Sequence, residues 1–138
     1  MMKKMIAIGL MLAGVAGFAG AGDVSVVVKN VASSTGFVRG ALCDKETFLK
    51  TCAQTASEKA NGDKVTLIFK NVPVGKYAFN AYHDENANGK MDRNLIGIPT
   101  EGYAFSRDAR GRRGPPLFDD AAFEVKDGSN DITVTLNY

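Results

Sequence analysis

Apolar and polar residues alternate with a period of two along most of the chain. The clearest alternations cover residues 24–29, 65–70, 77–82 and 132–138. Successive side chains of a β-strand point to opposite faces of the sheet, so this pattern predicts strands with one buried face. Shorter runs at residues 37–42 and 121–125 predict two further strands.

Turn-forming residues separate these runs, and a helical pattern is scarce. Asn, Asp, Gly and Pro punctuate the chain at residues 61–63, 73–75, 88–89 and 127–128. Only residues 45–59 suggest a short helix or turn, and residues 94–116, rich in Gly and Pro, predict an elaborate surface loop. We therefore expect an all-β fold, an antiparallel β-sandwich of about seven strands.

The N-terminal segment has the three parts of a secretory signal peptide. Lys3 and Lys4 are followed by an apolar run over residues 5–18 and by small residues at 19–21. We expect cleavage after Ala21, which leaves residues 22–138 as a single domain without a membrane span. The alternative is an uncleaved anchor, but the run is shorter than the roughly 20 residues that a span needs.

Removal of this segment changes the charge. Lys3 and Lys4 belong to the 17 Lys and Arg residues, and without them the basic residues equal the 15 acidic ones. A neutral exported domain lacks the basic surface that nucleic-acid binding requires. We therefore expect no nucleic-acid partner.

The two cysteines, Cys43 and Cys52, both lie in the predicted mature chain. In an exported protein such a pair predicts a disulfide, here one that closes a small loop. A metal site would need further Cys or His residues nearby, and a redox pair favours the closer C-x-x-C spacing.

Residues 84–92 carry the one motif that suggests chemistry. The pattern D-x-N-x-N-G-x-x-D predicts calcium ligands from the side chains of Asp84, Asn86, Asn88 and Asp92 and from the Lys90 carbonyl, with Gly89 at the sharp turn. Residue 95 is Leu rather than the bidentate Glu of an EF-hand. So few carboxylates predict a structural site with a Kd on the order of 10⁻⁴–10⁻³ M. The alternative is a plain hairpin turn.

His83 is the only histidine and adjoins Asp84. It could act as a metal ligand or general base, yet catalytic zinc sites use about three protein ligands, and no serine has a nucleophile-elbow context. We expect a hydrogen-bonding role at the end of a strand and no catalytic residues.

The loop at residues 94–116 offers two candidate binding features. A basic run of Arg107, Arg110, Arg112 and Arg113 could contact an anionic partner or be a solvated loop balanced by nearby Asp residues. Tyr103 and Phe105 could stack on sugars or fill the end of the core, and the alternation around Phe105 favours the core.

Two stretches carry a family resemblance: residues 69–78 running into 83–86, and residues 97–106. With the segments 114–116 and 118–121, they resemble the bacterial family named domain of unknown function 2141 across essentially the whole mature chain. This resemblance implies an exported, single-domain β-protein without an assigned activity. A looser similarity to transthyretin-like and collagen-adhesin B-type sandwiches implies a stalk, carrier or accessory module, although a fold alone does not determine function.

These observations favour a periplasmic or secreted, non-catalytic binding or structural module, with calcium as a structural ion and a protein or glycan partner in the cell envelope. One alternative is a metal-assisted or His-dependent hydrolase that uses His83 and neighbouring acids. Another is a carrier of small apolar ligands.

Overall fold

The structure is a computed structural model that describes residues 20–138. The predicted signal peptide, residues 1–21, lies outside the described residues except for its last two positions. Among the described residues, no helix has the length and apolar character needed to cross a bilayer.

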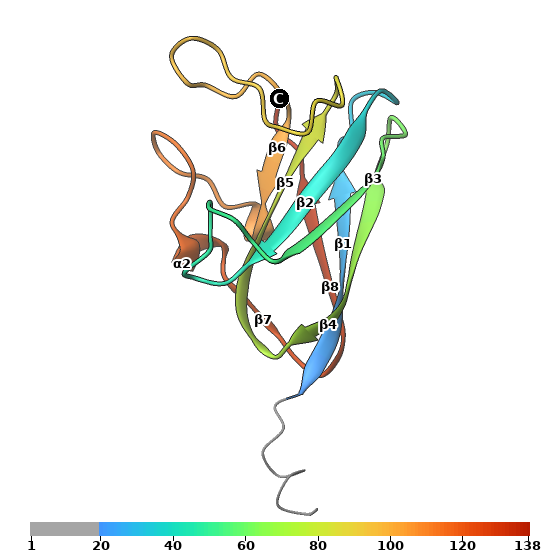
Figure 1. Ribbon diagram of the computed structural model, residues 1–138, viewed down its shortest axis with the longest axis vertical. Helices are drawn as coiled ribbons and strands as arrows, with labels where there is room; N and C mark the ends of the chain where they lie inside the picture. The colour runs from blue at the N-terminus through green and yellow to red at the C-terminus, as the bar shows by residue number, and fades with distance from the viewer. Residues whose placement is uncertain (1–19) are drawn as a thin grey trace, which may run out of the picture.

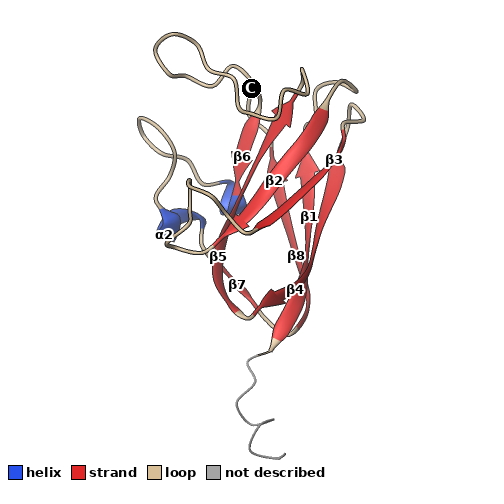
Figure 2. Ribbon diagram, viewed as in Figure 1, coloured by secondary structure: helices blue, strands red, loops and turns tan. Residues whose placement is uncertain are grey.

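The described chain forms a β-sandwich of two sheets, as predicted (Figures 1 and 2). The strands are β1 (Ala21–Lys29), β2 (Phe37–Cys43), β3 (Gln54–Lys59), β4 (Val65–Pro73), β5 (Gly75–Asp84), β6 (Tyr103–Phe105), β7 (Phe123–Val125) and β8 (Gly128–Thr135). One sheet has the order β4-β1-β8, and the other has the order β3-β2-β5-β6, with β7 also paired to β5. A 3₁₀ turn, η1 (Ser106–Asp108), and a short helix, α2 (Phe118–Ala121), lie between β6 and β7.

One pairing differs from the predicted antiparallel arrangement. β1 and β8 run parallel, from Gly22 beside Gly128 to Lys29 beside Thr135, whereas the other pairings of named strands are antiparallel. Alternation reports which face of a strand is buried but not the direction of its neighbour. The parallel pair therefore could not be read from the pattern.

The alternating residues build the core between the two sheets. Val24, Val26 and Val28 are fully buried in β1, and Phe69 meets Phe79 of the facing sheet edge to face, with ring centroids 6.0 Å apart. At Gly40 a Cβ atom would lie 2.7 Å from side-chain atoms of Leu67 and Phe79. A glycine at this position therefore lets the two sheets pack closely.

Two local expectations need correction. Residues 45–49 form the expected turn, but residues 54–59, which fall in the same suspected helix or turn, form strand β3 on the edge of β2. In the segment 121–125, Ala121 ends α2 and only residues 123–125 form a strand. Pairing with a neighbouring strand overrides the weak local preference of the polar sequence in β3.

The sulfur atoms of Cys43 and Cys52 lie at disulfide-bonding distance, with Cα atoms 5.1 Å apart, as predicted. Cys43 belongs to a second apolar cluster on the outer face of the five-stranded sheet. There Phe48, in the loop that the cysteines close, packs edge to face against Phe105 and Phe118. The crosslink therefore holds Phe48 against the outer face of this sheet.

Replacement of both cysteines by alanine should lower the free energy of unfolding by about 2–3 kcal/mol, because the unfolded chain regains the entropy of a small loop. Urea denaturation of the variant measures the loss. Wild-type protein in reducing agent serves as the control and should match the variant. Equal stability of the variant and the oxidised protein would contradict the structural role of the crosslink.

Candidate functional site

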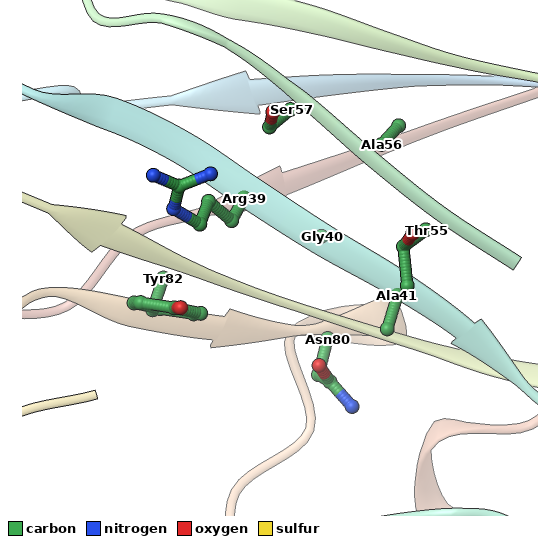
Figure 3. A pocket seen from close by; sticks show the side chains of 8 residues that line it. All are labelled: Arg39, Gly40, Ala41, Thr55, Ala56, Ser57, Asn80 and Tyr82. Carbon is green, nitrogen blue, oxygen red and sulfur yellow. The ribbon is translucent and has the colours of Figure 1, made fainter. Parts of the chain in front are cut away.

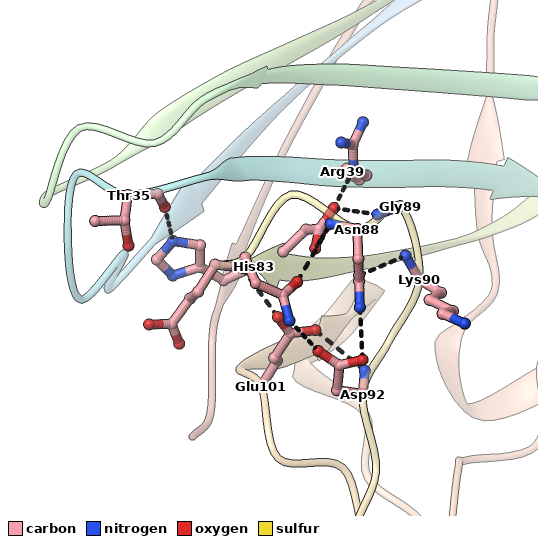
Figure 4. A network of polar contacts seen from close by, with 11 residues as sticks. Thr35, Arg39, His83, Asn88, Gly89, Lys90, Asp92 and Glu101 are labelled. Atoms are coloured by element: carbon pink, nitrogen blue, oxygen red, sulfur yellow. Dashed lines mark hydrogen bonds and ion pairs between the residues drawn. The ribbon is translucent and has the colours of Figure 1, made fainter.

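The motif at residues 84–92 forms a tight loop directly after β5 (Figure 4). Asp84 is the last residue of β5, and the N–H of Ala87 donates to its carbonyl oxygen at 3.2 Å. Ala87 and Gly89 have positive φ angles of 57° and 80°. The glycine thus takes a sharp turn at the position where the sequence predicted one.

Asp84 is a fully buried carboxylate at the base of this loop. Its Oδ2 accepts hydrogen bonds from Arg39 Nε at 2.7 Å and from the Gly89 N–H at 2.8 Å. Its Oδ1 accepts one from the Asn88 N–H at 3.1 Å. Burial raises the pKa of Asp84, but these hydrogen bonds outweigh burial and lower the pKa below its ordinary value of 3.8. Asp84 is therefore a carboxylate at neutral pH.

The other three predicted side-chain ligands meet at one point. Asp92 accepts hydrogen bonds from Asn86 Nδ2 at 2.6 Å and from Asn88 Nδ2 at 2.8 Å. The amide oxygens of Asn86 and Asn88 accept the N–H groups of Asn88 and Lys90. Lys90 enters this network through its N–H, and its side chain points away from the loop centre (Figure 4).

Two residues that sequence reasoning did not place complete the loop. Glu101, which is 6% exposed, accepts the Glu85 N–H at 3.0 Å and the Asp92 N–H at 3.1 Å. Arg39 reaches Asp84 from the adjacent strand β2. The sequence offers Glu85 and Glu101 as possible further oxygen donors without placing either of them, and nothing marked Arg39 among the outward positions of β2.

The loop offers oxygen donors of low total charge. Two carboxylates and two amides come from the motif, and the described residues contain no group of three or more His, Cys, Asp or Glu side chains that could hold a metal ion. A half-turn of each amide about χ2 exchanges Nδ2 for Oδ1 and turns an oxygen toward Asp92. A set of carboxylate and amide oxygens suits a hard cation such as Ca²⁺.

His83 is buried beside the loop and uses both ring nitrogens in the fold. The Thr35 carbonyl lies 2.8 Å from Nε2, so Nε2 carries the hydrogen and donates. Nδ1 then accepts from the Tyr138 hydroxyl at 2.8 Å, which itself accepts the Ala32 N–H. This arrangement joins the C-terminus to the end of β5 and matches the predicted hydrogen-bonding role.

Arg39 also borders a shallow hollow of about 410 Å³ on the outer face of the five-stranded sheet (Figure 3). Its guanidinium lies 4.8 Å from the centroid of the Phe37 ring. Burial raises the pKa of Tyr82, so its hydroxyl is a neutral donor at physiological pH. The hollow is lined by Arg39, Gly40, Ala41, Thr55, Ala56, Ser57, Asn80 and Tyr82.

The remaining candidates lie outside the loop at residues 84–92, which we name the calcium-type loop. Phe105 is buried in the second apolar cluster, as the alternation indicated. Arg107 and Arg110 contact the Ala122 carbonyl and the Asn137 side chain, respectively. Arg112 and Arg113 are exposed in the connection between η1 and α2.

Asp84 should make the folded state sensitive to acid. Because folding lowers its pKa, its contribution is complete above the unfolded pKa and is lost as pH falls through the folded pKa. Asp84→Asn should cost about 1.5–3 kcal/mol at pH 7, the range for hydrogen bonds to a charged group. Urea denaturation at a series of pH values should also show a shallower acid decline for the variant. Identical pH dependence of variant and wild type would contradict this role.

Tyr138→Phe should lower the free energy of unfolding by about 1–3 kcal/mol, because it leaves a buried acceptor on His83 and the Ala32 donor unpaired. Thermal and urea denaturation measure the effect. Tyr103→Phe provides a matched control, since no hydrogen bond from the Tyr103 hydroxyl is part of the described structure. Equal losses in both variants would show that the Tyr138 hydroxyl has no special role.

Comparison with known proteins places this chain in a family. Searches of curated proteins and of solved structures give no match. The family model described as "Uncharacterized protein conserved in bacteria (DUF2141)" matches residues 26–133, which include the end of β1 and the whole loop at 84–92. The chain therefore belongs to this bacterial family, as the resemblance of residues 69–86 and 97–106 indicated.

Proposed function

We propose that this chain is an exported, non-catalytic binding or structural module whose loop at residues 84–92 binds calcium as a structural ion. The observation that carries this proposal is the convergence of Asn86 and Asn88 on Asp92, next to Asp84, at the spacing of a calcium loop. Its partner is a protein or glycan of the cell envelope, in the periplasm or outside the cell.

The hydrogen bonds of the loop support calcium over a generic turn. The oxygens of Asp84, Asn86 and Asn88 each accept N–H groups from residues further along the loop, so the backbone wraps around them. The Asn86 and Asn88 amides also donate to Asp92, so the side chains of the motif already gather around one carboxylate. Calcium binding would turn each amide by half a turn, and contacts of the amide oxygens with the ion would replace their hydrogen bonds to the Asn88 and Lys90 N–H groups.

The Arg39–Asp84 pair sets the expected strength of binding. Arg39 neutralises one of the two carboxylates of the motif, which weakens the attraction for a divalent cation. A Kd on the order of 10⁻⁴–10⁻³ M is typical of extracellular calcium modules with few charged ligands. Such a site suits a compartment with millimolar calcium rather than a signalling switch.

A non-catalytic role agrees with the surroundings of His83. Both of its ring nitrogens are hydrogen-bonded to structural partners, and Cys43 and Cys52 are paired. Export is supported by the signal-like pattern of residues 1–21 and by this cysteine pair. We therefore expect the module to bind its partner through the outer faces of its sheets and through its loops.

Calcium titration of the processed chain, after treatment with a chelator, tests the ion site. We expect saturable heat with a Kd of roughly 10⁻⁴–10⁻³ M. Calcium at ten times the Kd should add about 1.4 kcal/mol to the free energy of unfolding. Asp92→Ala should abolish binding, and because Asp92 is only partly buried, the variant should remain folded.

Asp131→Ala serves as the matched control, since it removes an exposed carboxylate of β8 outside the loop. It should bind calcium as the wild type does. Absence of heat up to about 10 mM calcium, ten times the upper Kd expected for such modules, with all proteins folded, would reduce the loop to a hairpin turn. Asp84→Ala is the less informative variant, because it also leaves Arg39 without its partner.

A further inference from the structure

Residues 93–99 carry an unusual concentration of exposed aliphatic side chains. Leu95 is 106% exposed, Ile96 79% and Ile98 53%. We name residues 95–98 the aliphatic tip. Isolated exposed apolar residues are common on proteins, but three within four positions at the end of a projecting loop indicate an interaction site.

The aliphatic tip is held in a defined conformation. Asn94 Oδ1 accepts the N–H groups of Ile96 and Ile98 at 3.1 and 3.0 Å. Across the hairpin, the Asn94 N–H donates to the Ile98 carbonyl at 2.9 Å, and Arg93 Nη1 donates to the Gly97 carbonyl at 3.2 Å. The fold therefore presents these side chains to solvent on an ordered support.

A second loop on the same side of the molecule adds positive charge. The loop after β5 and the loop between η1 and α2 both project beyond β6, to the left in Figure 1. The second loop exposes Arg112 and Arg113, and it ends at Leu117, which is 74% exposed. Arg93, just before the aliphatic tip, is exposed as well. This side, the loop edge, thus combines aliphatic and cationic groups.

The charged residues within the two projecting segments are all arginines. Residues 93–100 contain Arg93, and residues 109–117 contain Arg110, Arg112 and Arg113, with no acid in either segment. The acids flank these segments and keep their charge: Glu85, Asp92, Glu101, Asp108, Asp119 and Asp120. The positive charge of the loop edge is therefore confined to the two projecting segments.

We infer that the loop edge binds the surface of an anionic lipid bilayer. Leu95, Ile96 and Ile98 would enter the boundary between headgroups and acyl chains, and the arginines would pair with lipid phosphates. This combination of aliphatic insertion and cationic contact is typical of peripheral membrane attachment. Three aliphatic side chains offer a protein partner little of the roughly 800 Å² per side that a stable interface buries.

The inference rests on the proposed function only in placing the chain in a compartment bounded by membranes. It goes beyond that proposal by adding a lipid surface to which the module attaches, separate from its protein or glycan partner. The calcium-type loop adjoins the stem of the tip, because the Thr100 N–H donates to the Asp92 carbonyl at 2.9 Å. An ion in the calcium-type loop would restrain Asp92 and Thr100 at the base of the aliphatic tip, but the aliphatic tip is exposed without an ion.

Vesicle flotation of the processed chain tests the inference. Vesicles of phosphatidylcholine with phosphatidylglycerol should bind the wild type, and vesicles of phosphatidylcholine alone should bind it more weakly. The double variant Leu95→Ser/Ile96→Ser should bind the anionic vesicles at least about tenfold more weakly, since each fully inserted aliphatic side chain is worth about tenfold. Arg112→Gln/Arg113→Gln should weaken binding and reduce its dependence on salt.

Ile68→Ser is the matched control, because Ile68 is an exposed aliphatic residue of β4, 49% exposed, in the other sheet. It should bind as the wild type does. Absence of binding to anionic vesicles, or equal losses in Ile68→Ser and the tip variant, would overturn the inference. Sedimentation that shows a dimer lost in the tip variant would also overturn it and assign the tip to a second copy of the chain.

Flotation in chelator and in calcium separates this inference from the calcium proposal. Vesicle binding that persists in a protein without measurable calcium binding would support the lipid surface and reject the ion site. Calcium binding without flotation in either condition would support the ion site and reject the lipid surface.

Discussion

The ion pair between Arg39 and Asp84 joins strand β2, the loop at residues 84–92 and the surface hollow. Asp84 ends β5 and begins the loop, and Arg39 reaches it from β2 with an N–O distance of 2.7 Å. The same carboxylate accepts the N–H groups of Asn88 and Gly89. The buried carboxylate of Asp84 thus connects β5 to β2, holds the turn at Asn88 and Gly89, and positions Arg39 at the edge of the surface hollow. Its burial is tolerated because each of its oxygens accepts a hydrogen bond.

A second carboxylate extends this arrangement outward from the sandwich. Glu101 accepts N–H groups from both ends of the loop, at Glu85 and Asp92. The residues between Asp92 and Glu101 therefore form a loop whose two ends are joined by a hydrogen bond. An ordered base explains how a loop with exposed aliphatic residues keeps a defined hairpin, since hydrogen bonds to charged acceptors are stronger than those between neutral groups.

Alternation predicted the two-sheet fold because each long strand has one buried face, as in Val24, Val26 and Val28. It could not predict the parallel pairing of β1 and β8, whose partners are distant in sequence. It also missed strand β3, whose polar sequence forms a strand only through its pairing with β2. The motif identified Asp84, Asn86, Asn88 and Asp92 because their spacing is local. Arg39 and Glu101 reach the loop only through the folded topology, and no pattern of neighbouring residues marks such a contact.

Competition for Asp92 determines what an ion can change in this protein. Two amide N–H groups already satisfy its oxygens, so a cation that binds there would replace good interactions rather than fill a deficit. The net gain in free energy would therefore be small. The conformation of the aliphatic tip depends instead on the hydrogen bonds of Asn94 and Arg93, and none of these bonds involves a residue of the motif at 84–92.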